Sequence, residues 1–290
     1  MSCHLLGSRL GTTVCSLGIL AAACQWAASA DLPHQTPTTP IELVLSPYIG
    51  NLRTVSLTAG PHTKPFLLDT GGGFTVLAPD LASALPCVPF GRVTGFRSSG
   101  ERFDLPRCGP VSLTLGPLSI RVEATVLDLT ALLSGAPPLG GLVSLQTLQN
   151  RSFTLDWARN RLIIETDSSL AQRVTSMQPI SVRTSRQAGG AALDLFLEIE
   201  AAQGSVWLEL DSGNSGPVLL SPHALIQLGL PESGPAVREV PLNVRGLGSI
   251  SMQVAVKPMI YDGLLNAAFL DSVVLAVDLR SERAWAMRHR

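Results

Sequence analysis

Two short stretches of the sequence resemble each other: Phe66-Leu67-Leu68-Asp69-Thr70-Gly71 and Trp207-Leu208-Glu209-Leu210-Asp211-Ser212-Gly213. Each begins with mostly apolar residues, which is typical of a buried strand, and ends in an aspartate followed by a hydroxyl residue and a glycine, which is typical of a turn. The two aspartates lie 142 positions apart in a chain of 290 residues. This recurrence predicts that the chain is internally duplicated.

The duplication continues further along the chain. Residues 141–162 match residues 263–284 without a gap, at an offset of 122 positions. The first copy therefore holds about 20 extra residues (142 − 122) between its aspartate and its Gly-Leu segment. Two copies are too few for a solenoid, so we predict two lobes related by a pseudo-twofold axis within one chain.

The composition predicts a mainly β fold with short helices. Aromatic residues make up only 5% of the chain, and 26 glycines and 21 prolines divide the apolar residues into short runs. Apolar and polar residues alternate in 119–126 and 194–200, as expected for strands with one buried face. We expect short helices at residues 78–82, 145–149, 221–225 and 267–271.

The charge pattern argues against several functions. The chain has 21 Lys and Arg against 22 Asp and Glu, a net charge of -1, and its basic residues are not clustered. Nucleic-acid binding depends on such clusters, so we expect no nucleic-acid partner. We also expect no metal and no cofactor, because the histidines are scattered and Gly71-Gly72-Gly73 lacks the spacing of a phosphate-binding loop.

The first 30 residues have the pattern of a secretory signal. A weakly basic start is followed by an apolar segment and then by Ala28-Ser29-Ala30, which predicts cleavage before Asp31. The apolar segment is too short for a membrane span, so we expect an exported protein, periplasmic or secreted. In a less favoured alternative, Cys24 is the anchor of a lipoprotein, because three alanines precede it. Residues 31–40 would form an exposed leader.

The cysteines support export. Three of the five lie before Asp31, which leaves Cys87 and Cys108 in the exported chain. Two cysteines in an oxidising compartment predict one disulfide, and it would lie within the extra segment of the first copy. The alternative is a pair of unrelated buried thiols.

Asp69 and Asp211 are the candidate reactive groups. A lone buried carboxylate is costly, so each aspartate at the end of a buried strand needs a partner. Two carboxyl groups brought together at a twofold axis can share one proton, which allows one to act as a base and the other as an acid. The residues expected to support the two turns are Thr70, Gly71, Ser212 and Gly213.

This repeated Asp-Thr/Ser-Gly motif with its downstream Gly-Leu segments resembles the aspartic peptidases of the pepsin and retropepsin type, and most closely the bacterial retropepsin-like proteins. The resemblance covers Pro40 to Met287. It implies two β-barrel-like lobes, 41–167 and 168–290, and a monomer that acts on peptides or proteins with Asp69 and Asp211 as catalytic residues. It also implies inner loops at Gly141, Leu142, Val143, Ser144, Gly263, Leu264, Leu265 and Asn266. The same resemblance predicts a flap, in the first lobe only, at Gly95, Phe96, Arg97, Ser98, Ser99 and Gly100.

The sequence departs from the family pattern at several positions. Gly72 and Asn214 stand where a hydroxyl residue is usual, and Ser144 and Asn266 stand where glycine is usual. The predicted flap also lacks a tyrosine. Two functions are therefore predicted: an exported aspartic endopeptidase or, as the alternative, an inactive relative that binds peptides or envelope partners in the same cleft.

Overall fold

A computed structural model describes residues 37–130, 133 and 135–289, all within one unit of the chain. The predicted signal, its cleavage site at Ala30, Cys24 and residues 31–36 of the predicted leader lie outside the described residues. Within the described ranges, every helix is too short or too polar to cross a membrane.

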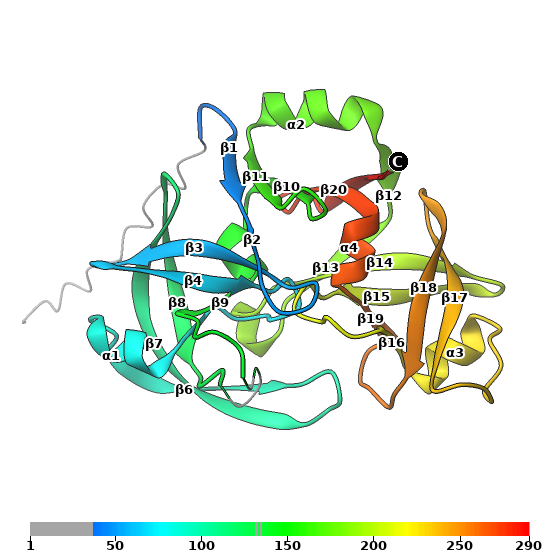
Figure 1. Ribbon diagram of the computed structural model, residues 1–290, viewed down its shortest axis with the longest axis horizontal. Helices are drawn as coiled ribbons and strands as arrows, with labels where there is room; N and C mark the ends of the chain where they lie inside the picture. Colours follow the sequence, from blue (N-terminus) through cyan, green and yellow to red (C-terminus); the bar gives the residue numbers. More distant parts are fainter. Residues whose placement is uncertain (1–36, 131–132, 134, 290) are drawn as a thin grey trace, which may run out of the picture. The chain divides into compact units, whose positions relative to one another are not determined.

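The first sheet has eight strands. In spatial order they are β2 (Ser46–Pro47), β3 (Arg53–Ala59), β4 (His62–Leu68), β9 (Gly141–Val143), β5 (Val76–Leu77), β8 (Leu118–Val126), β7 (Arg102–Leu115) and β6 (Pro89–Phe96) (Figure 1). Because β3 also pairs with β7, the six strands from β3 to β7 close into a barrel. Phe66, Leu67 and Leu68 at the end of β4 are all buried, since β4 lies between β3 and β9.

The second sheet repeats this arrangement. In spatial order its seven strands are β13 (Val182–Ser185), β14 (Asp194–Ala201), β15 (Gly204–Leu210), β19 (Gly263–Leu265), β16 (Val218–Leu220), β18 (Gly248–Val256) and β17 (Val237–Val244) (Figure 1). The pairing of β14 with β17 closes six strands into a second barrel. The two barrels confirm the predicted mainly β, bilobal architecture.

A third sheet joins the two copies of the repeat. Its order is β1 (Ile41–Val44), β11 (Arg161–Glu165), β10 (Ser152–Asp156), β20 (Val273–Asp278), β21 (Arg283–Arg288) and β12 (Gln178–Ile180). At its centre Thr154 pairs with Ala276, which lies 122 positions later and is therefore its own counterpart in the repeat. The pseudo-twofold axis passes through this pair.

Short helices connect the strands. They are α1 (Pro79–Ala84), η1 (Leu145–Leu148), α2 (Asp167–Arg173), η2 (Val174–Ser176), η3 (Ala188–Gly190), α3 (Pro222–Gln227) and α4 (Ala267–Ser272). The four predicted helices are present as α1, η1, α3 and α4, η1 as a 3-10 helix. The sequence analysis did not predict α2, which begins at a Thr166–Ser169 capping box in which serine replaces the usual glutamate or glutamine. The expected lobe boundary, 167/168, lies in the first turn of α2 and stays a prediction.

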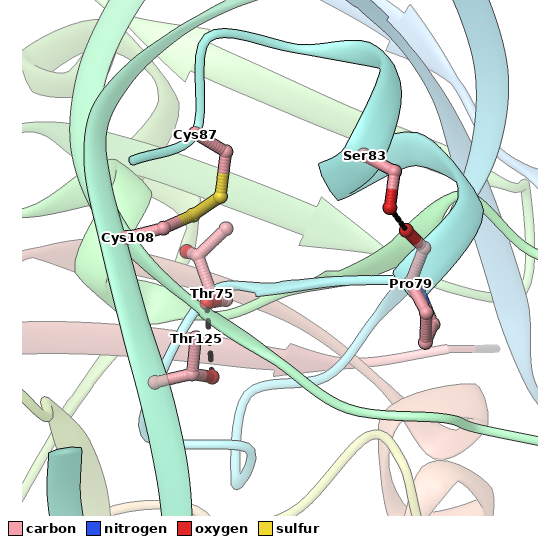
Figure 2. Close-up of a disulfide and its surroundings, with 6 residues drawn as sticks. All are labelled: Thr75, Pro79, Ser83, Cys87, Cys108 and Thr125. Atoms are coloured by element: carbon pink, nitrogen blue, oxygen red, sulfur yellow. Dashed lines mark hydrogen bonds between the residues drawn. A yellow bond between two sulfur atoms is a disulfide. The ribbon is translucent and has the colours of Figure 1, made fainter. Parts of the chain in front are cut away.

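The extra segment of the first copy forms strand β6 and the hairpin that it makes with β7. Within the described residues, the second sheet has no strand that corresponds to β6. Cys87, just before β6, forms a disulfide with Cys108 in β7, with the two Cα atoms 5.1 Å apart. Figure 2 shows this bond near helix α1, in which the Ser83 hydroxyl donates to the Pro79 carbonyl (2.8 Å). The predicted disulfide is confirmed, and the alternative of two separate thiols is wrong.

Replacing Cys87 and Cys108 together by alanine is expected to lower the free energy of unfolding by about 3 kcal/mol, because the bond closes a loop of roughly 20 residues in the unfolded chain. Urea unfolding of the oxidised parent, the reduced parent and the double variant measures this change. If all three unfold at the same urea concentration, the disulfide does not stabilise the fold.

Candidate active site

The two aspartates occupy equivalent turns. Asp69 follows β4 and Asp211 follows β15, and each turn is held by the neighbouring short strand. The backbone N–H of Asp69 donates to the Val143 carbonyl (3.0 Å), and that of Asp211 donates to the Leu265 carbonyl (2.9 Å). The predicted inner loops are therefore strands β9 and β19 for most of their length, because each pairs in parallel with the strand that leads to an aspartate.

Thr70 and Ser212 bind the two turns to each other. The Thr70 hydroxyl donates to the Leu210 carbonyl (2.5 Å) and accepts from the Ser212 backbone N–H (3.0 Å). In the reverse direction, the Ser212 hydroxyl donates to the Leu68 carbonyl (2.8 Å) and accepts from the Thr70 N–H (2.9 Å). Both side chains are buried, at 1% and 0% exposure. These contacts agree with the expectation that Thr70 and Ser212 support the two turns, and they join each turn to the other lobe.

The two carboxyl groups face each other across this link. They are close enough to shift each other's pKa, and each accepts from a backbone N–H group: Gly71 donates to Asp69 (3.1 Å) and Gly213 donates to Asp211 (2.9 Å). A Cβ atom added to Gly213 would lie 2.5 Å from Cγ of Asp69, and one added to Gly71 would lie 2.8 Å from Cγ of Asp211. Any larger residue at either glycine would therefore push the carboxyl groups apart.

Burial and mutual repulsion keep a proton on this pair. Burial raises the pKa of Asp69, although hydrogen bonds from Asp211 and from backbone N–H groups oppose this effect. The pKa of Asp211 is raised well above its ordinary value by burial and then by the negative charge of Asp69. The pair therefore holds one proton over a wide pH range and can offer one basic and one acidic oxygen at the same time.

A cavity of about 590 Å³ lies beside the pair. Asp211 lines it, together with Gly95, Phe96, Arg97 and Ser98 of the predicted flap. At the tip of that hairpin, Gly100 N–H donates to the Arg97 carbonyl (2.8 Å), which places Ser99 within the turn. The hairpin also reaches the second lobe, because the Ile260 N–H donates to the Ser98 carbonyl (2.8 Å). Four of the six predicted flap residues therefore line this cavity, and their role as a flap stays a prediction.

The four departures from the family pattern have local explanations. A Cβ atom at Gly72 would lie 2.6 Å from Cδ2 of Leu142, so there is no room for a serine without a shift. The Asn214 side chain donates to the Pro217 carbonyl (3.1 Å), while its backbone N–H contacts Asp211. Ser144 and Asn266 cap η1 and α4. The backbone N–H groups of Gly72 and Asn214 donate to the backbone carbonyls of Asp69 and Asp211 (3.3 Å each) and lower the pKa of the neighbouring carboxyl group.

The sequence analysis missed two further acids at the cavity. Glu209 and Asp194 both line it and are only 4% and 2% exposed. Glu209 lies in β15 two residues before Asp211, which directly follows that strand, so alternation of extended residues places both on one face. That spacing was a signal available in the sequence, whereas the position of Asp194 depends on how β14 and β15 pair. Among the described residues, no group of three potential ligands is arranged to hold a metal ion.

Thr70→Val is expected to lower the free energy of unfolding by about 2–5 kcal/mol, because it leaves the Ser212 N–H and the Leu210 carbonyl buried without their partner. Thr70→Ser keeps the hydroxyl and should retain most of the stability. Urea unfolding of both variants measures the difference. An unfolding free energy of Thr70→Val equal to that of the parent would show that this link is not needed for stability.

The raised pKa of Asp194 predicts that the free energy of unfolding falls as the pH rises. Burial is the main reason that its pKa is raised from 3.8 to about 6, so the folded chain holds this proton more tightly than the unfolded chain does. The contribution of the protonated Asp194 carboxyl group to the free energy of unfolding is full below about pH 4 and is lost as the pH rises through about 6. Asp194→Asn should remove this part of the decline, on the order of 3 kcal/mol.

Thermal unfolding of the parent and Asp194→Asn between these pH values measures the effect, and the exposed Asp80→Asn is the control. An unchanged slope in Asp194→Asn would contradict the assignment. Glu209 and Asp211 also have raised pKa values, so some decline should remain in the variant.

Comparison with known proteins gives a fold and no family assignment. No family model matches the sequence, and no curated protein does. Among solved structures, the chain is similar to basic 7S globulin from soybean, with a TM-score of 0.54, 13% identity, and coverage of 86% of this chain and 95% of that one. It is also similar to conglutin gamma, a basic 7S globulin from lupine seeds (TM-score 0.54, 10% identity, 86% and 94% covered). The aspartic proteinase from Irpex lacteus is similar as well (TM-score 0.51, 13% identity, 86% and 97% covered). At these identities the likeness shows the fold alone, which is the bilobal fold of an aspartic peptidase.

Proposed function

We propose that this protein is an aspartic endopeptidase in which Asp69 and Asp211 activate water against a peptide bond. The observation that carries the proposal is the pair of carboxyl groups at equivalent turns, brought together by the Thr70 and Ser212 hydrogen bonds beside a cavity. The similarity to the Irpex lacteus aspartic proteinase supports it at the level of the fold. Within that class, the two tandem repeats in one chain favour the bacterial retropepsin-like type.

In the proposed reaction the two aspartates act together. Asp69 accepts a proton from water as the water oxygen bonds to the carbonyl carbon, and Asp211 donates its proton to the carbonyl oxygen. We assign the proton of the pair to Asp211 because burial and the negative charge of Asp69 raise the pKa of its carboxyl group well above the ordinary value. When the tetrahedral intermediate breaks down, Asp69 gives the proton that it accepted to the leaving nitrogen and Asp211 takes a proton back from a hydroxyl of the intermediate. The carbon–nitrogen bond breaks and an acid and an amine are released. Neither step requires a metal or a cofactor.

The arrangement within one chain also supports a monomeric enzyme. Both carboxyl groups come from the same chain, one from each of lobes 41–167 and 168–290, so a second copy is not needed to complete the pair. The flap, residues 95–100, would close over a bound peptide from the first lobe. Activity is therefore expected to rise in proportion to the protein concentration.

Export is part of the same proposal. The disulfide between Cys87 and Cys108 fits an oxidising compartment, periplasmic or extracellular. The signal at residues 1–30, with cleavage after Ala30, remains a sequence-based proposal, and acylation at Cys24 is its less favoured rival. The intact mass of the exported protein distinguishes the two.

Asp69→Asn and Asp211→Asn should each abolish cleavage of a denatured protein while leaving the fold intact. An amide cannot serve as the base or the acid, and either change relieves the repulsion between two buried carboxyl groups, so the stability should match or exceed that of the parent. Cleavage assays across pH, with and without a pepstatin-type inhibitor, test this, and circular dichroism verifies the fold. Asp80→Asn, on the surface, is the matched control.

A second candidate function is peptide binding without cleavage. Gly72 and Asn214, in place of hydroxyl residues, favour it, and two of the similar structures are named as globulins. In that case the parent would bind peptides but leave them intact at every pH tested. Near-parental cleavage by either Asn variant would instead contradict the proposed pair of catalytic residues.

A further inference from the structure

The pseudo-twofold axis allows the two halves of the cleft to be compared residue by residue. Asp69 and Asp211 are 142 positions apart, and the same offset relates Leu52 to Asp194 and Leu67 to Glu209. The strand registers agree with this offset, since Thr54 pairs with Leu67 in the first lobe and Phe196 with Glu209 in the second. The two lobes therefore place different side chains at equivalent positions around an otherwise similar pair of turns.

In the first lobe these positions are apolar. Leu52 and Leu67 are buried and pack with Val76, Leu129 and Leu142 in one cluster. The last three also line the cavity. This half of the cleft can accept an apolar side chain of a bound peptide.

In the second lobe the equivalent positions are acidic and lack cationic partners. Asp194 accepts one hydrogen bond, from the Gln187 amide (2.9 Å). Glu209 is 4% exposed as a whole residue, and among the residues that the structure describes none forms a hydrogen bond or an ion pair with its carboxyl group. Both acids line the cavity next to Asp211. Four carboxyl groups thus lie close together, and in the described part of the chain no cationic side chain forms an ion pair with any of them.

The basic residues near the cleft are engaged elsewhere. Arg97, on the flap, pairs with Glu101 (3.4 Å), and Arg183 lies over the rings of Phe196 and Trp207. Burial raises the pKa of Glu209 well above its ordinary value, and the charges of Asp194, Asp211 and Asp69 raise it further. An unpaired buried acid is costly, and a cation entering the cavity would relieve that cost.

We propose that the half of the cleft formed by the second lobe binds a lysine or arginine side chain of the peptide, with Glu209 and Asp194 as the specificity-determining residues. This inference rests on the proposed peptidase function. The opposite half, lined by Val76, Leu129 and Leu142, takes an apolar side chain. The substrate would then carry a basic residue on one side of the bond that is cut and an apolar residue on the other.

The size and the walls of the cavity fit such a side chain. A volume of about 590 Å³ holds more than one side chain, and Tyr261 and Leu264 provide apolar surface for the methylene groups of a lysine. Tyr261 is held in place by an edge-to-face contact with Phe196 and by the Gln187 amide (2.5 Å). At the equivalent position of the first lobe, 122 residues earlier, stands Leu139.

The first experiment uses the parent protein and a library of N-acetylated peptides, in which the α-amino group cannot act as the cation. Mass spectrometry identifies the residues on either side of each cut. We expect lysine and arginine to be enriched at one of these two positions and apolar residues at the other. Cuts with no enrichment of basic residues on either side would overturn the inference and leave the peptidase function intact.

The second experiment compares two peptides that differ only by lysine or uncharged norleucine at the enriched position. Glu209→Gln should lower the ratio of kcat/KM for lysine over norleucine about tenfold, the size expected for the loss of one charge-assisted contact. Asp194→Asn should act in the same direction, and the exposed Glu232→Gln should leave the ratio unchanged. A ratio that is unaffected by both cleft variants would overturn the inference.

A binding measurement separates this inference from the proposed function. Fluorescence anisotropy of a labelled lysine peptide and its norleucine counterpart reports affinity without requiring cleavage. If the parent cleaves nothing but binds the lysine peptide about tenfold more tightly, and Glu209→Gln removes that difference, the peptidase proposal fails and the cation subsite stands. Equal binding of the two peptides, or no binding of either, overturns the subsite.

Discussion

The hydrogen bonds between Thr70 and Ser212 are the contact on which the rest of the site depends. Each hydroxyl donates to a carbonyl of the other lobe and accepts a backbone N–H from it, so four bonds form within a buried space. Buried polar groups must find partners, and here each turn can find them only in the other turn. This mutual requirement sets the spacing of the turns and thereby brings Asp69 and Asp211 face to face.

Around this link the backbone is nearly symmetric, while the functional surface is not. Two barrels of six strands close in the same way, and the third sheet runs through the axis at Thr154 and Ala276. Symmetry is broken by strand β6, which carries the hairpin over the cavity and is tied to β7 by the disulfide. It is broken a second time at the positions equivalent to Asp194 and Glu209, which are Leu52 and Leu67 in the first lobe. A duplicated frame can therefore bind an asymmetric peptide in a defined direction.

The acids at the centre combine a stability cost with a chemical use. Burial raises the pKa values of Asp69, Asp211, Asp194 and Glu209, so in each case the protonated form is favoured more than it would be in water. For the central pair this keeps a proton where acid–base chemistry needs one. For Asp194 and Glu209, burial makes the charged forms of the carboxyl groups unfavourable, and a bound cation would stabilise those charged forms. Perturbed acids of this kind are frequent at functional sites.

The sequence alone was sufficient for the duplication, the mainly β class, the four short helices, the disulfide and the pairing of Asp69 with Asp211. These features follow from the internal repeat, from the alternation of apolar and polar residues and from the number of cysteines. None of these requires knowledge of how the strands pair. The tertiary structure was needed to show that Gly141–Val143 and Gly263–Leu265 are strands, that Ile260 contacts the flap, and that Asp194 lies near Glu209. Those neighbours are set by strand register and barrel closure, which depend on contacts between residues far apart in the chain.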